Sequence, residues 1–168
     1  MDRVMIIAEA GVNHNGDLGL AKEMVLKAKE AGADYVKFQT AIPELVISRY
    51  AEMAEYQKAN TGTVESQLEM CKRLHLRLDD YGTLKGFCEE VGIKFGSTPF
   101  DLVSIGVLDR LNVDFIKIPS GEVTNLPYLR AVNSCGRAVI LSTGMSSLGE
   151  IDAALKVLKD CDVTLFAF

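Results

Sequence analysis

The hexapeptide YVKFQT, at residues 35–40, is a short apolar run that contains one lysine and ends in polar residues. The octapeptide FIKIPSGE, at residues 115–122, repeats this pattern with a lysine again in third place. Short apolar runs bounded by turn residues are typical of strands buried in a parallel sheet. Because a lysine is costly to bury without a partner, both segments predict a polar site at the carboxyl ends of their strands.

Outward from these segments, strand-like runs alternate with longer stretches of helical period. Strands are predicted at residues 4–8, 35–39, 93–97, 115–118, 138–141 and 163–166. Helices are predicted at residues 18–31, 64–74, 79–91, 102–111, 126–134 and 148–159. Gly32, Gly92 and Gly136 fall where helices should end, and Ser147 with Glu150 forms a capping box. This alternation predicts an α/β fold with a parallel sheet.

The residues that follow the strands favour a (β/α)₈ TIM barrel over an open doubly wound sheet. No GxGxxG or P-loop motif follows a predicted strand, which weakens the nucleotide-binding open-sheet interpretation. In a barrel the carboxyl ends of the strands converge and carry the active site, and a complete barrel usually takes about 250 residues. We therefore predict an incomplete TIM barrel of about six strands over residues 1–168. A short open sheet that dimerises through its edge strand is the alternative.

Composition and charge exclude several classes of protein. Hydrophobic residues make up 48% and charged residues 24% of the chain, as in a globular domain. The net charge of −5 argues against a nucleic-acid-binding surface. No apolar run approaches the roughly 20 residues of a membrane helix, and no signal peptide is visible, so we expect a cytoplasmic protein without a membrane partner. The four scattered cysteines and two separated histidines predict reduced thiols and no metal cage within this chain.

The polar residues at the strand ends predict a site for a small anionic molecule. Ammonium groups, hydroxyls and exposed backbone N–H groups are donors for phosphate and carboxylate oxygens. The candidate donors are Lys37, Thr98, Lys117, Ser120, Gly121 and Ser142. Glu9, which ends the first predicted strand, is a candidate general acid or base, and the structural alternative is an ion pair with Lys37 or Lys117.

Three further features carry alternatives that the residues alone leave open. The connection at residues 40–64 has little periodicity, and it is either a functional lid or a partly disordered insertion. His14, followed by Asn15-Gly16, can equally be a turn residue. His75 lies near a helix end, where a structural role is expected.

Five motifs occur in order along the chain: EAGVNHNG at residues 9–16, VKFQT at 36–40, STPF at 97–100, KIPSGE at 117–122 and LSTGM at 141–145. Together they resemble the bacterial sialic acid synthase family, which comprises N-acetylneuraminate, legionaminate and related nonulosonate synthases. The resemblance covers essentially the whole chain. It implies that residues 1–168 are the N-terminal portion of a TIM barrel, without the C-terminal part of the barrel and the antifreeze-like domain of the family.

The resemblance also implies a reaction, the condensation of phosphoenolpyruvate with an N-acetylmannosamine-type sugar and release of phosphate by C–O cleavage. By motif position it implies that phosphoenolpyruvate is held by Lys37, Thr98, Lys117, Ser120, Gly121 and Ser142. Glu9 would be the catalytic carboxylate near the N-acylated aminosugar, and Gln39 and Asn60 would be sugar-side residues. The family uses Mn²⁺ or Mg²⁺, whose histidine ligands come from later strands, so no metal ligand is expected before Phe168.

The resemblance further implies a homodimer for the full-length enzyme and an inactive isolated fragment. Two competing functions remain open. One is a Schiff-base aldolase in which Lys37 or Lys117 attacks a keto substrate, and the other is a non-catalytic anion-binding module. A metal-independent isomerase on the same fold is a further possibility, and the sequence does not fix the acceptor sugar.

Overall fold

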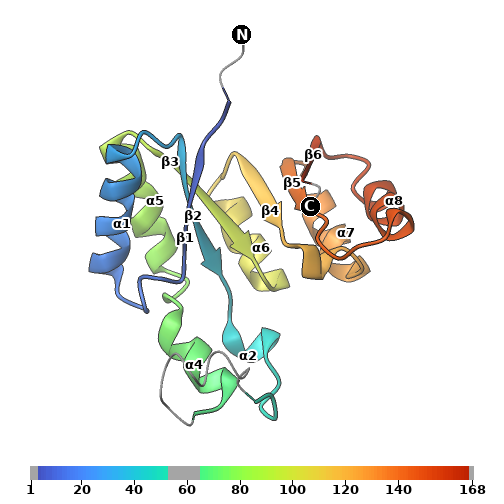
Figure 1. The fold of residues 1–168 in the computed structure, drawn as a ribbon, viewed down its shortest axis with the longest axis horizontal. Coiled ribbons are helices and arrows are strands. Elements are labelled where there is room, and N and C mark those ends of the chain that lie inside the picture. The colour runs from blue at the N-terminus through green and yellow to red at the C-terminus, as the bar shows by residue number, and fades with distance from the viewer. Residues whose placement is uncertain (1–3, 53–64, 167–168) are drawn as a thin grey trace.

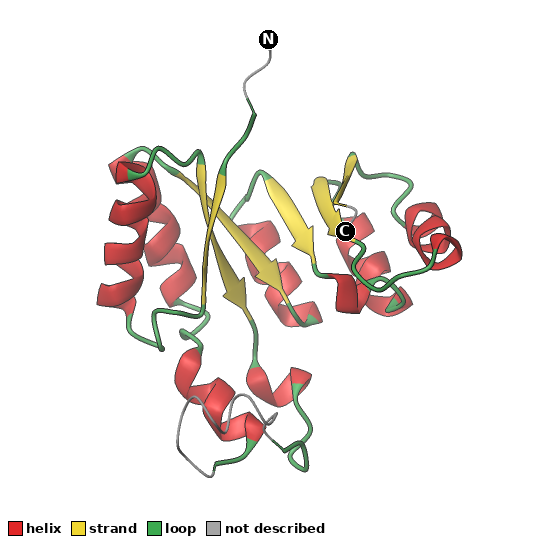
Figure 2. Cartoon of the chain, viewed as in Figure 1, coloured by secondary structure: helices red, strands yellow, loops and turns green. Residues whose placement is uncertain are grey.

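The computed structural model describes residues 4–52 and 65–166, which form an α/β fold (Figures 1 and 2). The strands are β1 (Ile7–Gly11), β2 (Tyr35–Thr40), β3 (Lys94–Pro99), β4 (Phe115–Ile118), β5 (Ala138–Ser142) and β6 (Val163–Phe166). The helices are α1 (Leu18–Glu30), α2 (Pro43–Val46), α4 (Gln67–Leu74), α5 (Asp80–Val91), α6 (Leu102–Arg110), the 3₁₀ helix η1 (Ser120–Glu122), α7 (Leu126–Ser134) and α8 (Leu148–Val157). None of the helices in these two ranges is both long and apolar enough to cross a membrane.

The described strands form two parallel three-stranded sheets in sequential order, β1-β2-β3 and β4-β5-β6. Strands β3 and β4 lie side by side where the two sheets meet (Figure 2). A doubly wound sheet would instead reverse its strand order at a switch point. The sequential order within each sheet confirms the expected parallel α/β arrangement and brings the carboxyl ends of β2, β3 and β4 toward the same side of the molecule (Figure 1).

Each strand divides its side chains between two faces, because successive residues of a strand point in opposite directions. On the outward face, Val36 and Phe38 of β2 and Ile116 and Ile118 of β4 pack with buried helix residues in the main hydrophobic core. On the opposite, inward face a separate small cluster is formed by Tyr35, Phe115 and Ile140, with Ile7 against it. The inward face is therefore apolar near the amino ends of the strands.

Most element boundaries agree with the sequence predictions to within two residues, but the first strand does not. It was expected at residues 4–8, whereas β1 begins at Ile7 and ends at Gly11. Val4, Met5 and Ile6 are exposed, and the residue-by-residue register with β2 starts at Ile7, although the Ile6 carbonyl already accepts hydrogen bonds from the Asp34 and Tyr35 N–H groups. Apolar character alone therefore placed this strand three residues too early, and Glu9 lies within β1 rather than at its end.

Local helix signals behave as predicted. Gly92 ends α5 in the left-handed conformation, with φ of 75°, which favours glycine. Ser147 and Glu150 form the expected capping box at the start of α8. The short helices α2 and η1 were not predicted, because four- and three-residue helices carry too little periodicity to be recognised.

Two buried tyrosines fix the carboxyl ends of the central strands from the helix side. Tyr81 of α5 donates a hydrogen bond to the Gln39 carbonyl at 2.6 Å, and Tyr128 of α7 donates one to the Pro99 carbonyl at 2.8 Å. Both side chains are fully buried, and burial raises the pKa of both hydroxyls. The two tyrosines thereby position residues that border the inward face.

The substitution Tyr81→Phe should lower the free energy of unfolding by about 0.5–1.5 kcal/mol, because it removes the hydrogen bond to the partly buried Gln39 carbonyl. Tyr50→Phe removes a hydroxyl from a side chain that is 85% exposed and should change stability by less than about 0.5 kcal/mol. Urea unfolding of both variants checks the prediction. Equal losses in the two variants would show that the Tyr81–Gln39 bond does not matter.

Candidate functional site

An open cavity of about 420 Å³ lies at the carboxyl ends of the strands on the inward face. It is lined by five of the residues predicted from the sequence, Glu9, Lys37, Gln39, Thr98 and Lys117. These side chains come from β1, β2, β3 and β4, four elements that are distant in the sequence. All five side chains lie on the same face of their strands as the inward apolar cluster. Glu9, Lys37 and Lys117 each follow a residue of that cluster by two positions. Gln39 follows Tyr35 by four positions, and Thr98 is the register partner of Gln39.

Lys37 is the centre of the polar contacts in this cavity. Its ammonium group forms an ion pair with the Glu9 carboxylate, and it donates a hydrogen bond to the Thr98 hydroxyl at 3.0 Å. Glu9 and Lys37 are direct partners in the register of β1 and β2, which explains their contact. The Lys37 side chain is only 12% exposed, whereas that of Glu9 is 51% exposed. The ion pair foreseen as the structural alternative for Glu9 is therefore formed, with Lys37 rather than Lys117.

Lys117 is the second cation of the cavity, and its positive charge is compensated less well than that of Lys37. Its ammonium group donates a hydrogen bond to the Ile118 carbonyl at 2.7 Å. Burial and the charge of Lys37 lower the pKa of Lys117 to about 8, and the Glu9 carboxylate opposes this shift. Lys117 therefore changes its charge close to physiological pH, which is typical of residues in functional sites.

The other predicted donors lie outside the lining of this cavity. Ser120 and Gly121 belong to η1, which follows the lining residue Pro119, and Ser142 ends β5. A Cβ atom at Gly144 would lie 3.5 Å from the Ser120 hydroxyl oxygen, so the connections after β4 and β5 are close together. Asn60 lies outside the described residues.

Several cavity residues were not singled out from the sequence. Val12, Asn13, Phe100 and Pro119 line the cavity, and each lies within one of the quoted motifs. Gly11 also lines it, with φ of 58°, and a Cβ there would lie 3.4 Å from a Glu9 carboxylate oxygen and 3.7 Å from the Gln39 amide nitrogen. The motif EAGVNHNG was the available signal, but it did not indicate which of its residues face the cavity.

The two histidines lie apart from the cavity lining. His14 is fully buried in the turn after β1, where its Nδ1 accepts a hydrogen bond from the Gly16 N–H at 3.1 Å. Burial, followed by the charge of His75, lowers the pKa of His14. His75 caps the end of α4, and its Nδ1 lies 2.9 Å from the Cys71 carbonyl oxygen. Both histidines have the local structural contacts that the sequence suggested.

The donors that the structure describes do not fit a divalent cation on their own. Over residues 4–52 and 65–166 there is no group of three or more His, Cys, Asp or Glu side chains that could hold a metal ion. The cavity carboxylate Glu9 is already paired with Lys37. The chemistry available from these residues is anion binding and proton transfer.

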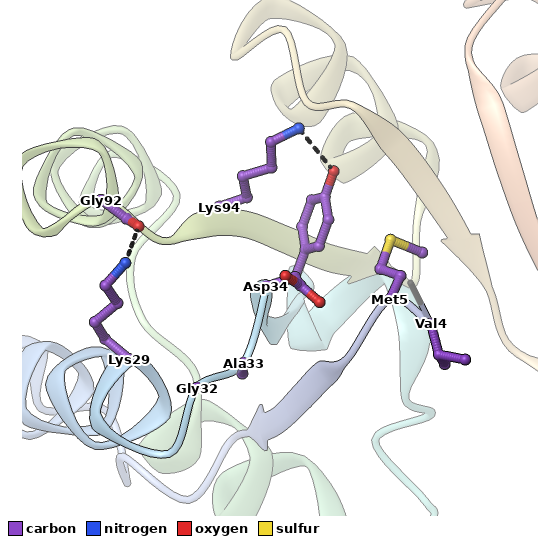
Figure 3. Close-up of a pocket in the computed structure, with 9 residues that line it drawn as sticks. Val4, Met5, Lys29, Gly32, Ala33, Asp34, Gly92 and Lys94 are labelled. Atoms are coloured by element: carbon purple, nitrogen blue, oxygen red, sulfur yellow. Dashed lines mark hydrogen bonds between the residues drawn. The ribbon is translucent and has the colours of Figure 1, made fainter. Parts of the chain in front are cut away.

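A larger cavity, of about 640 Å³, lies at the amino ends of the strands and includes Lys29, Asp34, Tyr35 and Lys94 (Figure 3). Its lysines are directed at partners within the protein. Lys29 donates to the Gly92 carbonyl at 2.5 Å, and Lys94 donates to the Tyr35 hydroxyl at 3.2 Å (Figure 3). Lys94 also forms an ion pair with Asp114 at 2.8 Å. The first contact joins the ends of α1 and α5, and the others join the starts of β2 and β3 to the residue before β4. Size alone therefore does not identify the site, and the smaller cavity is the functional candidate.

Comparison with known proteins gives one family. Residues 24–167 match the model of the NeuB family. The N,N'-diacetyllegionaminic acid synthase of Campylobacter jejuni is 49% identical over 158 residues, which are 94% of this chain and 47% of that protein. The human N-acetylneuraminate-9-phosphate synthase is 37% identical over 92% of this chain and 43% of that protein. The chain thus spans about half the length of the curated relatives it matches.

A solved structure gives the same result. The N-acetylneuraminic acid (sialic acid) synthetase of Leptospira borgpetersenii, crystallised in complex with citrate, superimposes with a TM-score of 0.83 at 30% identity. The match covers 99% of this chain and 54% of that one. The agreement extends over all the elements described above.

The depressed pKa of Lys117 can be tested by competitive labelling of the lysines with acetic anhydride, followed by peptide mass spectrometry. Lys117 should become reactive with a midpoint near pH 8, because burial and Lys37 disfavour its charged form. Lys27, whose pKa is raised by its hydrogen bond to Glu30, serves as the control and should stay unreactive until a much higher pH. In Glu9→Gln the Lys117 midpoint should fall further, since a charge that raises it is lost. A Lys117 midpoint like that of Lys27 would contradict the prediction.

Proposed function

This chain belongs to the NeuB family, and on this premise we propose that it provides the phosphoenolpyruvate-binding half of a nonulosonate synthase. The relatives at 49% and 37% identity are synthases of diacetyllegionaminic acid and of N-acetylneuraminate 9-phosphate. The proposed reaction condenses phosphoenolpyruvate with an N-acetylmannosamine-type sugar and releases phosphate. The proposed protein is a cytoplasmic enzyme that acts as a homodimer at full length.

The proposed fold is a (β/α)₈ TIM barrel, of which this chain supplies about six strands. The sequential strand order and the division into an outward face under helices and an inward face support this assignment. The cavity also lies at the carboxyl ends of the strands, where barrel enzymes carry their active sites.

The observation that carries the proposal is the pairing of two lysines on one inward face. Lys37 and Lys117 line the same cavity together with the Thr98 hydroxyl and the Gln39 amide. Phosphoenolpyruvate carries a phosphate and a carboxylate, and these anions are bound best by cationic and hydroxyl donors. Without such a ligand, two largely buried ammonium groups that repel each other would be unfavourable.

The proposed steps assign a task to each residue. C3 of phosphoenolpyruvate attacks the aldehyde carbon of the open-chain sugar, water adds at C2, and cleavage of the C2–O bond releases phosphate. Lys37, Thr98 and Lys117 hold the anionic groups, while Ser120, Gly121 and Ser142 on the adjacent connections would complete the phosphate contacts. Lys117 Nζ, with a pKa of about 8, can hold or release a proton at the pH of the reaction.

The acceptor sugar would meet the open side of the cavity. Glu9 is its proposed catalytic carboxylate, and Gln39 and Asn60 are the proposed sugar-side residues, of which Glu9 and Gln39 line the cavity. The divalent cation of the family, Mn²⁺ or Mg²⁺, would polarise the aldehyde oxygen when bound. The 168 residues by themselves are proposed to bind phosphoenolpyruvate without turning it over, because the described donors among them form no metal site.

Calorimetry with phosphoenolpyruvate tests the proposal. Lys37→Gln and Lys117→Gln should each weaken binding by about ten- to a hundredfold, as expected for the loss of a charge-assisted hydrogen bond. Lys29→Gln, in the cavity at the amino ends of the strands, removes the same charge and should leave affinity unchanged. Wild-type affinity should also fall as the pH rises through about 8, because Lys117 loses its charge.

A different outcome would favour the aldolase. If borohydride traps a keto-acid adduct on Lys37 or Lys117, the Schiff-base mechanism replaces the proposed one. If the chain does not bind phosphoenolpyruvate at any pH between 6 and 9, the phosphoenolpyruvate pocket is wrong. The acceptor is identified by product analysis of a protein that contains both halves of the family, assayed with several N-acylated aminosugars.

A further inference from the structure

Glu9 occupies the position on Lys37 that an anionic ligand would use. The Glu9 carboxylate forms an ion pair with the Lys37 ammonium group inside the candidate cavity, and both side chains line it. An ammonium group has three hydrogens to donate. Two are directed to Glu9 and Thr98, so an incoming phosphate has little of Lys37 left to contact.

The ion pair is not needed to hold Lys37 in place. Thr98 of β3, which is 3% exposed, accepts a hydrogen bond from Lys37 through its hydroxyl. The Lys37 side chain is only 12% exposed, so the surrounding residues also enclose it. The Glu9 side chain is 51% exposed and is therefore less enclosed than that of Lys37. Gly11, two residues further along β1, has no side chain to block a rotation of the Glu9 carboxylate, since a Cβ there would lie 3.4 Å from it.

Charge also favours release of Glu9 when an anion binds. A phosphate monoester carries about −1.5 to −2 charges at neutral pH. Placed on Lys37 and Lys117, it would lie next to the Glu9 carboxylate, and like charges at such distances repel. In the empty cavity Glu9 compensates the charge of Lys37, and in the filled cavity the phosphate does so. Neither state then leaves the Lys37 charge uncompensated.

We propose that Glu9 is an internal competitor for the anion site: its carboxylate neutralises Lys37 in the empty cavity and is displaced by the phosphate group of a ligand. The inference rests on the proposed function only in treating the cavity as an anion site. It differs from a positioning role for Glu9, because the two roles predict opposite effects of removing the charge. A positioning carboxylate would strengthen anion binding, whereas a competing carboxylate weakens it.

The test is calorimetric titration of wild type and Glu9→Gln with inorganic phosphate and, separately, with phosphoenolpyruvate. Glutamine has the same shape as glutamate but cannot form the ion pair, and Glu9 is exposed enough for the variant to fold. We expect Glu9→Gln to bind phosphate about three- to tenfold more tightly, the range of a half-exposed ion pair plus the lost repulsion. The control Glu30→Gln removes a carboxylate that pairs with Lys27 at the end of α1 and should leave phosphate affinity unchanged.

The outcomes separate the inference from the proposed function. Unchanged or weaker phosphate binding by Glu9→Gln overturns the competitor role, even if phosphoenolpyruvate binds well to the wild type. Absence of phosphate binding in both proteins also overturns it. Tighter phosphate binding by Glu9→Gln, without any preference of either protein for phosphoenolpyruvate over phosphate, upholds the competitor and argues against the synthase assignment. An equal gain in Glu30→Gln would reduce the effect to net charge and reject the inference.

Discussion

The structure of the cavity follows from the need to compensate two ammonium groups on the inward face of buried strands. Removing a lysine from water disfavours its charged form unless a partner restores the lost hydration. Lys37 obtains that compensation from the Glu9 carboxylate and the Thr98 hydroxyl. Lys117 has a backbone carbonyl as its hydrogen-bond partner and Lys37 as a repelling neighbour, and its pKa accordingly falls to about 8. One lysine thus has two polar partners within the cavity, and the other has a pKa lowered to about 8.

This arrangement depends on strict alternation along the parallel strands. Outward residues supply the core under the helices, which leaves every second position of each strand for the inward face. A shift of one residue in the pairing of β1 with β2 would move Glu9 away from Lys37 and bury it under α1. The two sheets are also connected on the inward face, where a Cβ at Gly96 would lie 3.1 Å from the Phe115 ring. The absence of a side chain at Gly96 therefore lets Phe115 of β4 approach β3.

Features that depend on local sequence could be predicted from the chain, and features that depend on pairing between distant segments could not. The helix ends at Gly92 and the cap at Ser147 are local, and so is the position of Lys37 within its strand. Which lysine would pair with Glu9 depends on the register of β1. The start of that strand was misplaced because Val4–Ile6 are apolar but exposed, and they lie before the register with β2 begins. Ser120 and Ser142 were grouped with the lysines because of their place at strand ends, although Ser120 lies in η1, Ser142 lies at the end of β5, and neither lines the cavity. The positions of the strand ends therefore predict on which side of the fold the cavity lies. The register of the strands and the connections after them determine which side chains line it.

The inward face itself supplies the argument that its charges serve a ligand. On β4, Phe115 and Lys117 are two residues apart on the same face, and on β2 the same relation holds between Tyr35 and Lys37. Toward the amino ends this face is filled by an apolar cluster of Tyr35, Phe115 and Ile140, which shows that apolar side chains can pack on it. Replacing an ion pair in a protein interior by apolar residues is often neutral or stabilising. Stability therefore gives no reason for each strand to change from an aromatic ring to an ammonium group over two residues. The change coincides with the carboxyl-end cavity, and an anion bound there would provide the compensation that Lys117 lacks within the chain.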